Sequence, residues 1–503
     1  MGTRAHSAYL AVIGLAACGG SEGRSVGITV DVTAPVARVD ERFVGIAVDT
    51  AQVVGGEFWD PFNTDPAMPN VPVPPYDFSR PRLRELARAL APAMLRIGGT
   101  DADLTYYDLS DTPIETPVAP DRWVLTRAKW DGVLTFAELI QAPILFTLNA
   151  GAAHRNEAGQ WIPDNARTLI DYSVANGDRV AVWELGNEVN LYPAIHRLSL
   201  DPVDYAADTS TAKALLDERA PGALLAAPSS AYWPVSGEIR PFYPAFMNAG
   251  SATIDLVTWH YYPQQSGRCP FASRAAEPGL LLDPANLDEI HTWAAEVEAA
   301  RDQRSPQMPV WLGETGHAQC GGEPGLSDAF EASLWWVDEL GLIARRGQPM
   351  VIRQTLSGGS YGLIDEASLE PNPDYWATLL WRRVMGPHVL AATTSDPTVR
   401  AYAHCTPGMS GAVTVVAINL DATQPAQISL NAGASSAAEV YVVSAPSRDA
   451  RIVTINGEQA VVGVDNVPVI PAATSGSAGS ISVPPASFAF AVMTGAAAAA
   501  CSP

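Results

Sequence analysis

Short apolar runs without polar alternation recur between residues 42 and 387, with helical patterns between them. Uninterrupted apolar runs of this length are typical of parallel strands that are buried on both faces. The helical patterns Arg82–Leu90, Leu287–Ala300 and Asp328–Ala344 each gather their apolar side chains on one face. Eight strand-then-helix units in this span predict an α/β fold, a (β/α)8 TIM barrel. The eight expected strands are Val44–Asp49, Met94–Ile97, Ile144–Asn149, Val180–Leu185, Leu224–Ala227, Leu256–Tyr262, Val310–Gly313 and Val351–Gln354.

After residue 387 the pattern changes, because Ala, Val, Ser, Thr and Pro dominate and charged residues become sparse. Runs such as Ala412–Asn419, Glu439–Val443 and Phe488–Met493 are separated by turn residues, which predicts a C-terminal antiparallel β-sandwich over residues 388–503. In the segment 26–41, Ile28–Val32 alternates like a strand, and we expect it to join this sandwich. The chain thus divides into a barrel, residues 42–387, and a sandwich that an N-terminal strand completes.

Residues 1–25 have the pattern of a processing signal and tether. Arg4 and His6 precede the apolar run Tyr9–Ala17, which is too short to span a bilayer. The run ends in Leu-Ala-Ala-Cys, which resembles the bacterial lipobox, whose cysteine, here Cys18, becomes the lipidated first residue of the mature protein. A Gly/Ser/Glu-rich tether, Gly19–Ser25, follows. We expect export to the bacterial cell envelope, with membrane attachment only through the lipid; a plain signal peptide is the alternative.

Composition narrows the class of partner. The chain has 503 residues, of which 47% are apolar, so it can fill a sizeable core, and its formal net charge is −23. Such a surface repels nucleic acid and anionic membranes, so we expect no nucleic-acid partner. A local basic patch would still allow an anionic sugar chain to bind.

Four cysteines remain after Cys18, and export to an oxidising compartment favours disulfides among them. Four cysteines allow three pairings. Cys269 and Cys320 both follow expected barrel strands, and Cys405 and Cys501 both lie in the sandwich region. We therefore favour the pairs Cys269–Cys320 and Cys405–Cys501. No His/Cys spacing is typical of a zinc site, so we expect no metal.

Two carboxylates are the strongest chemical signal. Glu188 lies three residues past the fourth expected strand, and Glu314 directly follows the seventh. Active-site groups of TIM barrels come from the carboxyl ends of strands, and strands four and seven face each other across the barrel mouth. Two opposed carboxyls, one protonated and one ionised, are what glycoside hydrolysis requires. Hydrolysis by two carboxyl groups needs no organic cofactor, so we expect none. Glu184 is a weaker candidate, because it lies within its strand and more readily pairs with a buried arginine.

Several segments resemble glycoside hydrolase family 79, the heparanase and β-glucuronidase family of clan A. The similarity runs through most of the chain, and Asn187-Glu188 within it is shared across the whole clan. The matching segments are Leu95–Thr100, Leu185–Glu188, Thr258–Tyr262, Trp311–Thr315, Tyr361–Glu366, Pro373–Trp376, Arg400–Cys405 and Ala499–Cys501. In this family, cysteines at the last two places are paired, which supports the Cys405–Cys501 bridge.

The resemblance implies a role for each matched residue. Glu188 is the general acid/base and Glu314 the nucleophile of a retaining mechanism, while Asn187 hydrogen-bonds the sugar 2-hydroxyl. Tyr262 is the phenol that keeps the nucleophile ionised, with Tyr261 as the alternative register, and the nearby His260 is a further residue expected to bind substrate. Further substrate-binding residues implied in this way are Asp103 and, at the end of the eighth strand, Gln354.

The resemblance also implies recognition of a uronic carboxylate. Tyr361 matches a phenol that binds this group, and backbone N–H groups of a glycine run bind it as well. The run aligns with Cys320, Gly321 and Gly322 here. A tyrosine that is common just before the run is Gln319 in this chain, which exchanges a phenol for an amide.

These features predict a retaining exo-β-glucuronidase. A long loop, Phe58–Phe78, would close the site beyond the terminal sugar. The alternative is an endo-β-glucuronidase of heparanase type acting on glycosaminoglycan chains, for which a few cations would flank the cleft. Those candidate cations are Arg122, Arg127, Lys129, Arg268 and Arg274. Two less favoured functions are that of a non-catalytic, glycan-binding surface lipoprotein and that of a clan-A hydrolase for arabinose or xylose.

Overall fold

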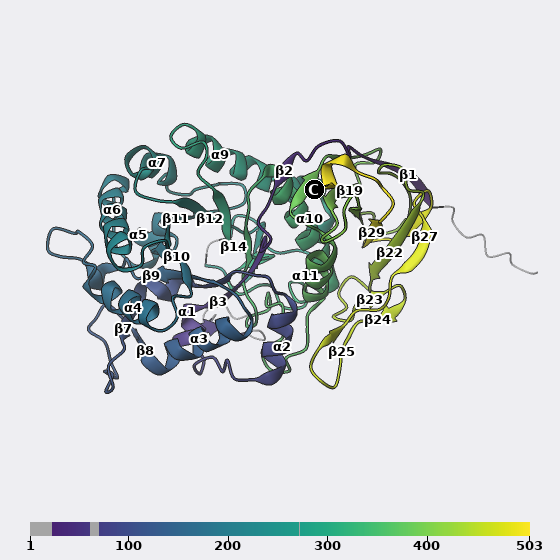
Figure 1. Ribbon diagram of the computed structural model, residues 1–503. Helices are drawn as coiled ribbons and strands as arrows, with labels where there is room; N and C mark the ends of the chain where they lie inside the picture. Colours follow the sequence, from purple (N-terminus) through teal and green to yellow (C-terminus); the bar gives the residue numbers. More distant parts are fainter. Residues whose placement is uncertain (1–22, 61–69, 271, 503) are drawn as a thin grey trace, which may run out of the picture.

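In the computed structural model, residues 23–60, 70–270 and 272–502 are described. Eight parallel strands of this part of the chain close into a barrel, in the order β10-β11-β12-β14-β16-β3-β6-β9. Figure 1 shows the barrel beside a layered β-structure formed mainly by the part of the chain after residue 387. The expected (β/α)8 fold is therefore confirmed. The signal segment with Cys18 lies outside the described residues.

The barrel strands begin close to where the apolar runs begin, and their ends differ by a few residues. β14 runs through Thr315, so Glu314 lies inside the strand and not after it, and β11 extends five residues beyond its expected end. The strands are β3 (Val44–Asp49), β6 (Leu95–Gly98), β9 (Ile144–Leu148), β10 (Val180–Leu185), β11 (Leu224–Tyr232), β12 (Leu256–Tyr261), β14 (Val310–Thr315) and β16 (Val351–Arg353).

The helices pack mainly around the barrel, with their apolar faces against it. They are α1 (Thr50–Val54), α2 (Pro81–Ala89), α3 (Arg127–Leu139), α4 (Asp164–Ala175), α5 (Tyr192–Ile195), α6 (Pro202–Arg219), α7 (Tyr243–Gly250), α8 (Pro284–Asp288), α9 (Ile290–Asp302), α10 (Phe330–Arg346) and α11 (Pro373–Val384).

Three short strand pairs lie at the barrel mouth. They are β4 (Glu57–Trp59) with β5 (Asn70–Pro72), β7 (Thr105–Asp108) with β8 (Trp123–Thr126), and β13 (Gln264–Gln265) with β15 (Ala318–Gln319). The pairing of β4 with β5 shows that part of the long loop expected at Phe58–Phe78 is a strand pair. Residues 61–69 of that loop lie outside the described residues.

Two further sheets form the sandwich. The smaller has the order β18-β1-β21-β28, and the larger follows the path β2-β17-β19-β20-β29-β22-β23-β24, with β27 beside β22. β1 begins at Arg24, earlier than expected, and runs parallel to β21 but antiparallel to β18. The strands are β1 (Arg24–Val30), β2 (Ala37–Arg38), β17 (His388–Leu390), β18 (Ala392–Thr394), β19 (Val399–Cys405), β20 (Val413–Asn419), β21 (Ala426–Asn431), β22 (Ala437–Ser444), β23 (Thr454–Ile455), β24 (Glu458–Gln459), β27 (Thr474–Ser477), β28 (Ile481–Val483) and β29 (Ser487–Met493), and a separate pair joins β25 (Val461–Val462) and β26 (Pro468–Val469).

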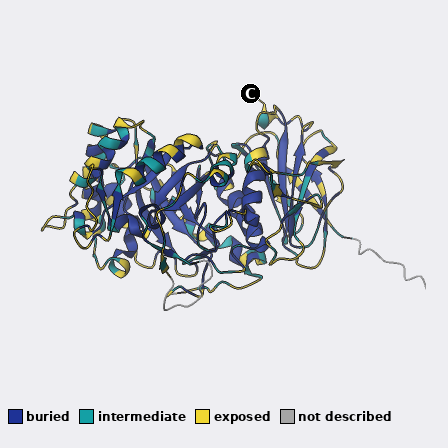
Figure 2. Ribbon diagram, turned by 90° about the horizontal axis from the view of Figure 1, so that it is seen from below, coloured by how far each residue is buried: buried dark blue, intermediate teal, exposed yellow. Residues whose placement is uncertain are grey.

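The barrel and the sandwich share one apolar core. One face of the larger sheet packs on α10 and α11, where Phe488 stacks on Phe330 and Phe490 meets Trp381 edge-on. Its other face packs on the smaller sheet through a second core that includes Val26 and Ile28 of β1. Figure 2 shows buried residues continuing from the barrel into both sheets. This shared core fixes the sandwich against the barrel.

Two disulfides tie loops together, Cys269–Cys320 at the barrel mouth and Cys405–Cys501 in the sandwich. These are the two pairs favoured from the sequence. Among the described helices, none combines the length and the apolar character needed to cross a membrane.

Candidate active site

Glu188 lies three residues beyond β10, at the mouth of the barrel. Its backbone is left-handed (φ 53°, ψ 50°), a conformation that is uncommon for residues other than glycine. It immediately precedes the 3-10 turn Val189–Leu191, and only 6% of the residue is exposed. The unusual backbone turns this carboxylate back over the barrel instead of letting it continue outward with the chain.

Glu314 lies on β14, across the barrel from Glu188. The Tyr262 hydroxyl donates to its Oε1 at 2.6 Å, and the Arg96 guanidinium donates to its Oε2 at 2.6 Å. The strand pairing is irregular on both sides of Glu314, where the registers with β12 and β16 shift. Both carboxylate oxygens are thereby held in place, which leaves one face of the group available for attack on a sugar carbon.

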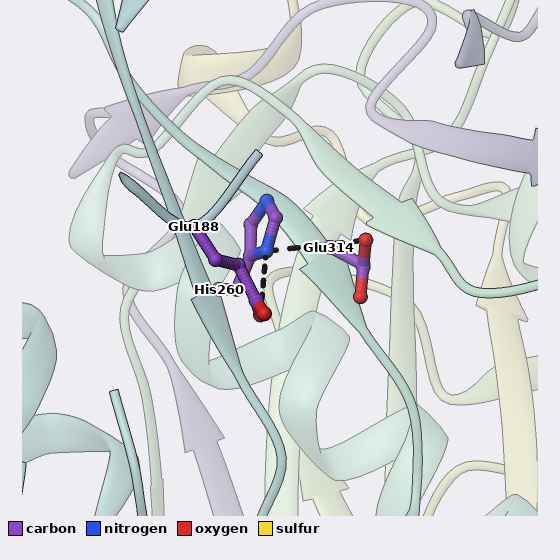
Figure 3. Close-up of side chains that lie close together, drawn as sticks. All are labelled: Glu188, His260 and Glu314. Carbon is purple, nitrogen blue, oxygen red and sulfur yellow. Dashed lines mark hydrogen bonds and ion pairs between the residues drawn. The ribbon is translucent and has the colours of Figure 1, made fainter. Parts of the chain in front are cut away.

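His260 of β12 lies between the two carboxylates (Figure 3). Its Nδ1 is 3.2 Å from Oε1 of Glu188 and 3.9 Å from Oε2 of Glu314. One oxygen of each carboxylate and a ring nitrogen all lie within 4.8 Å of one another. Carboxyl groups about 5–5.5 Å apart are typical of retaining glycosidases, whereas inverting enzymes need about 6.5–9.5 Å. The two carboxyl groups are therefore close enough to act on the same sugar.

Arg96 of β6 organises the floor of the site and is fully buried. Its Nη2 donates to Oε2 of Glu184 at 3.0 Å and to Oδ1 of Asn187 at 2.9 Å, while Nη1 holds Glu314. Glu184 therefore pairs with a buried arginine, as expected from its place within the strand. Since a planar guanidinium presents its donors at fixed angles, this network sets the relative positions of Asn187 and Glu314.

The electrostatics favour an ionised Glu314. Burial alone would raise its pKa, but His260, Arg96 and the Tyr262 hydroxyl outweigh that effect, and the pKa is lowered from its ordinary value. Burial in turn raises the pKa of Tyr262 well above its ordinary value, so the phenol remains a proton donor to the carboxylate. An ionised, hydrogen-bonded carboxylate is what a glycosidase nucleophile requires.

The neighbours of His260 fix the orientation of its ring. Nε2 lies 2.8 Å from Oγ of Ser229 and 3.4 Å from Nη2 of Arg96. Nδ1 lies 3.2 Å from Oε1 of Glu188, to which an Nδ1–H donates. His260 thus orients this carboxylate, which differs from the direct substrate contact expected from the sequence.

Asp49, at the end of β3, is a site residue that the sequence analysis missed. Its Oδ2 accepts from Nε2 of Gln354 at 3.0 Å, and its Oδ1 caps α1 through the Ala51 N–H. Burial, then the charges of Glu314 and Asp101, raise the pKa of Asp49 to about 8. A neutral carboxyl beside an ionised one can both donate and accept hydrogen bonds. The available signal was its position, since Asp49 ends the first expected barrel strand.

The expected carboxylate-binding loop follows β14. Its backbone is left-handed at three successive residues, with φ of 65° at Cys320, 83° at Gly321 and 81° at Gly322. Consecutive N–H groups in such conformations form anion-binding concavities. Within the described part of the chain, no acceptor faces the N–H groups of Cys320 and Gly321, whereas Gly322 donates to the carbonyl of Ala318. Gly322 is therefore corrected from a ligand-binding residue to one that closes the turn.

The expected tyrosine and glutamine lie beside this loop. Tyr361 is 3% exposed and packs with Phe58 and Tyr262, and the N–H of its neighbour Ser360 donates to the carbonyl of Gly321 at 2.6 Å. Burial raises the pKa of Tyr361 well above its ordinary value, and it keeps its proton for donation. Tyr361, Gln354 and the Cys320–Gly321 amides thus lie on the Glu314 side of the site.

Two further expectations need correction or resolution. Asp103 is fully buried, and its carboxylate accepts from the N–H groups of Ala150 and Asn187, both at 2.9 Å. It therefore supports the turn that carries the acid/base candidate, and both of its oxygens are engaged by the protein instead of facing the site as the sequence led us to expect. Tyr261 lies in the core between barrel and helices, next to Trp259, so Tyr262 is the phenol at the nucleophile.

The five cations expected to flank a cleft all donate to acceptors within the described part of the protein. Arg122 pairs with Glu57, Arg127 with Asp111 and Arg274 with Glu289, while Lys129 donates to the carbonyls of Val54 and Val124, and Arg268 to that of Gly322. Three of the five thus have a carboxylate partner. A strongly cationic groove for polyanions is not formed by this set.

Glu188, His260 and Glu314 could also coordinate a divalent cation, since their ligand atoms lie so close together. The Arg96 guanidinium, 2.6 Å from Glu314, already places a full positive charge against this set. A second cation would be repelled by it. The arrangement suits acid/base and nucleophilic chemistry better than metal binding.

Residues 25–341 match the family model described as "Glycosyl hydrolase family 79, N-terminal domain". The chain is 31% identical to Heparanase-like protein 1 of Arabidopsis thaliana over 379 residues, covering 71% of this chain and 67% of that protein. It is 31% identical to Heparanase of Rattus norvegicus over 381 residues, covering 65% and 67%. A solved structure, a 4-O-alpha-L-rhamnosyl-beta-D-glucuronidase from Fusarium oxysporum, aligns with a TM-score of 0.68 at 16% identity, over 92% of this chain and 100% of that one. At that identity, the structural match supports the fold alone.

Proposed function

Since the chain belongs to glycosyl hydrolase family 79, we propose that it is a retaining exo-β-glucuronidase that releases terminal β-linked glucuronic acid. The family and the barrel fold are those of glycosidases. The observation that carries the proposal is the pair formed by Glu188 and Glu314, two buried carboxylates that each have an oxygen within 4.8 Å of the other and of His260. The specificity for glucuronic acid rests on the Cys320–Gly321 amides and Tyr361.

The proposed reaction is a double displacement. In the first step, a Glu314 oxygen attacks the anomeric carbon while protonated Glu188 donates its proton to the departing glycosidic oxygen. The C–O bond to the leaving group breaks, and a covalent glycosyl ester of Glu314 forms. In the second step, Glu188, now ionised, takes a proton from water, whose oxygen attacks the same carbon and releases Glu314. Two inversions give net retention.

The neighbouring residues support these roles. Asn187 presents its amide beside Arg96, where it can reach the 2-hydroxyl of a sugar bound over Glu314. Arg96 and Tyr262 stabilise the carboxylate as it leaves the glycosyl ester in the second step. His260 holds Glu188 in position, and Asp49 with Gln354 lies on the sugar side of the nucleophile.

The leaving-group side is more apolar than a sulfated chain would require. Glu188 precedes the turn that carries Leu191, which packs with Ala231 and Trp233 in a small cluster apart from the main core. The loop after β11, residues 233–242, carries a single cation, the exposed Arg240, and its single acid, Glu238, is turned inward to cap α7. A neutral or apolar aglycone fits this side better than a polyanion.

One comparison tests the proposal. The purified protein is assayed with 4-nitrophenyl β-D-glucuronide and, separately, with heparan sulfate and hyaluronan oligomers analysed by chain length. We expect release of nitrophenol and no internal cleavage. Internal cleavage of either polymer would establish the endo-acting alternative of heparanase type. Binding of oligomers without any hydrolysis would favour the glycan-binding lipoprotein, which has no need for two opposed carboxylates.

We also propose that the protein is exported and held at the cell envelope by a lipid on Cys18. Its processing in a bacterial host should then be blocked by globomycin, and Cys18→Ser should move the protein from the membrane fraction to the soluble fraction. Globomycin-insensitive processing would leave an ordinary signal peptide as the explanation.

A further inference from the structure

A short segment that follows β13, Ser266–Cys269, packs directly behind the carboxylate-binding loop. The Ser266 N–H donates to the carbonyl of Gln319 at 3.1 Å, and Cys269 is bonded to Cys320. Its other end is fixed by Glu323, which accepts from both the Ser266 hydroxyl and the Gly267 N–H at 2.8 Å. The segment and the loop are therefore joined by covalent and hydrogen bonds into one unit.

Arg268 lies at the centre of this unit, and its side chain is fully buried. Its Nη2 donates to the carbonyl of Gly322 at 2.7 Å, and its Nη1 donates to the carbonyl of Asp60. The guanidinium also lies over the ring of Trp59, 5.9 Å from the centroid. A charged group is costly to bury, so its presence behind this loop calls for a compensating role.

The loop fits closely against this guanidinium. A Cβ at Gly321 would lie 3.0 Å from Nη2 of Arg268 and 2.3 Å from Cβ of Trp59. Gly321 also has a φ of 83°, so only glycine suits the position. The amide of Gly321, one of the two expected carboxylate ligands, is thus held close to a buried positive charge.

The charge balance of the site explains why a cation is useful there. A uronic acid entering the site would face Glu188 and Glu314, both acidic, on a chain with a net charge of −23. Arg96 is already engaged by Glu184 and Glu314. Arg268 is the cation that acts on Tyr361, whose pKa it lowers in part, and burial lowers the pKa of Arg268 itself. An added anion next to a desolvated guanidinium is stabilised strongly.

We propose that Arg268, held in place by the Cys269–Cys320 disulfide, determines the specificity of this site for a carboxylated sugar. Arg268 acts through the positive electrostatic potential that its charge creates at the Cys320–Gly321 amides. It determines specificity and takes no part in making or breaking bonds. The disulfide acts by positioning both groups. The inference rests on the proposed function and explains how a site lined with acids admits an anionic substrate.

Inhibitor binding tests the role of Arg268. Two iminosugars are compared, one glucuronic-acid-configured and one that carries a hydroxymethyl group in place of the carboxylate. We expect Arg268→Gln to weaken the acidic inhibitor about tenfold or more while the neutral one changes by less than about twofold. Arg268→Lys should retain part of the preference. An equal loss for both inhibitors, or an unchanged preference, would overturn the proposal.

The disulfide is tested with Cys269→Ala/Cys320→Gly, in which glycine suits the φ of 65° at position 320. The expected result is a rise of about fivefold or more in KM for 4-nitrophenyl β-D-glucuronide with kcat changed by less than about twofold. The matched control is Cys405→Ala/Cys501→Ala, which removes the sandwich disulfide and should leave KM unchanged. A KM that stays at the wild-type value in the first variant would refute the positioning role.

The outcomes separate this inference from the proposed function. If the wild-type protein neither hydrolyses the aryl glucuronide nor prefers the acidic inhibitor, the proposed function fails. If it does both, and Arg268→Gln keeps the full preference, only the role of Arg268 fails. Thermal unfolding of each variant shows whether the fold is intact.

Discussion

Single residues at this site differ in protonation because their partners differ. Glu314 is held by a guanidinium and a phenol, both of which donate to its ionised form. Asp49, a few side chains away, is buried among other acids, and its pKa is raised to about 8. Burial opposes ionisation of both groups, so the donors around each carboxyl decide its state.

Tyr262→Phe should move the acid limb of kcat/KM to higher pH. The phenol helps to lower the pKa of Glu314, and the nucleophile works only when ionised, so activity extends to a lower pH with the hydrogen bond than without it. Loss of one hydrogen bond to a charged group should also reduce kcat/KM by about 10- to 100-fold. The measurement is a pH profile of both proteins. An acid limb that stays in place or moves to lower pH would contradict the role of Tyr262.

Asp49→Asn should change how stability depends on pH. Native Asp49 keeps its proton up to about pH 8, whereas in the unfolded chain it loses it near pH 4, so the native state binds more protons in this interval. Wild-type stability therefore falls relative to that of Asp49→Asn as the pH rises from about 4 to 8, by up to about 1.4 kcal/mol per pH unit.

Chemical denaturation at pH 5 and pH 7.5 measures this difference. Asp77→Asn is the control, because Asp77 is exposed and its pKa is lowered by Ser79, so its linkage lies below pH 4. A stability difference between wild type and Asp49→Asn that is independent of pH would show that Asp49 is ionised in the native protein.

At the residue scale, the sequence predicts the position of Glu188 at the barrel mouth, because this residue follows closely on a strand end. The sequence does not show that backbone N–H groups of the turns after two other strands would occupy the carboxylate of Asp103. The sequence analysis missed Asp49 for the converse reason, since only closure of the barrel brings the first strand beside the eighth.

At the scale of elements, the turn that carries Glu188 is fastened to the next strand by one side chain. The Asn190 amide donates to the carbonyl of Ala231 at 2.9 Å and accepts from the N–H of Ala231 at 3.0 Å. These two hydrogen bonds resemble the paired backbone hydrogen bonds between neighbouring strands. The side-chain amide of Asn190 and the backbone N–H and carbonyl of Ala231 are all buried. This contact fixes the 3-10 turn Val189–Leu191 relative to β11.

Asn190→Ala should lower kcat by about tenfold or more with little change in KM, since it leaves the sugar-binding residues intact but frees the turn. It also leaves two buried backbone groups without a hydrogen-bond partner, and each should lower the free energy of unfolding by about 1–3 kcal/mol. The unfolding temperature should therefore fall. Asn248→Ala, at an exposed asparagine, serves as the control. A variant with normal kcat would show that the turn holds Glu188 without this tether.

The strand pattern located the elements well because buried parallel strands are continuous apolar runs. Strand ends were less predictable. β14 continues through Glu314 to Thr315. Pairing with neighbouring strands decides where a strand ends, and the local sequence does not reveal that pairing. The β4–β5 pair was expected as part of a long loop for the same reason.

At the scale of the whole molecule, the N-terminal strand links distant parts of the chain. β1 lies between β18 and β21, and its Val26, Ile28 and Val30 fill the core between the two sheets. The alternation of this segment predicted a strand in the sandwich. Its parallel pairing with β21, which comes much further along the chain, could not be predicted from the alternation of the segment.

Ile28→Ala should destabilise the protein by about 2–4 kcal/mol without changing kcat/KM, because Ile28 is fully buried in the sandwich and the reaction takes place in the barrel. Thr29→Ala, the exposed neighbour on the same strand, should change stability by less than about 0.5 kcal/mol. Calorimetry and aryl glucuronide kinetics measure both. Equal effects of the two substitutions would contradict the assignment of β1 to the core.

The central claim is that Glu314 forms a covalent bond to a glucuronic acid. The most direct measurement is mass spectrometry of the protein after incubation with a glucuronic-acid-configured aziridine, which alkylates a retaining nucleophile. We expect one added inhibitor per chain, located on the peptide that contains Glu314 and absent from Glu314→Gln. A label on Glu188 or elsewhere, or labelling of Glu314→Gln, would contradict this claim.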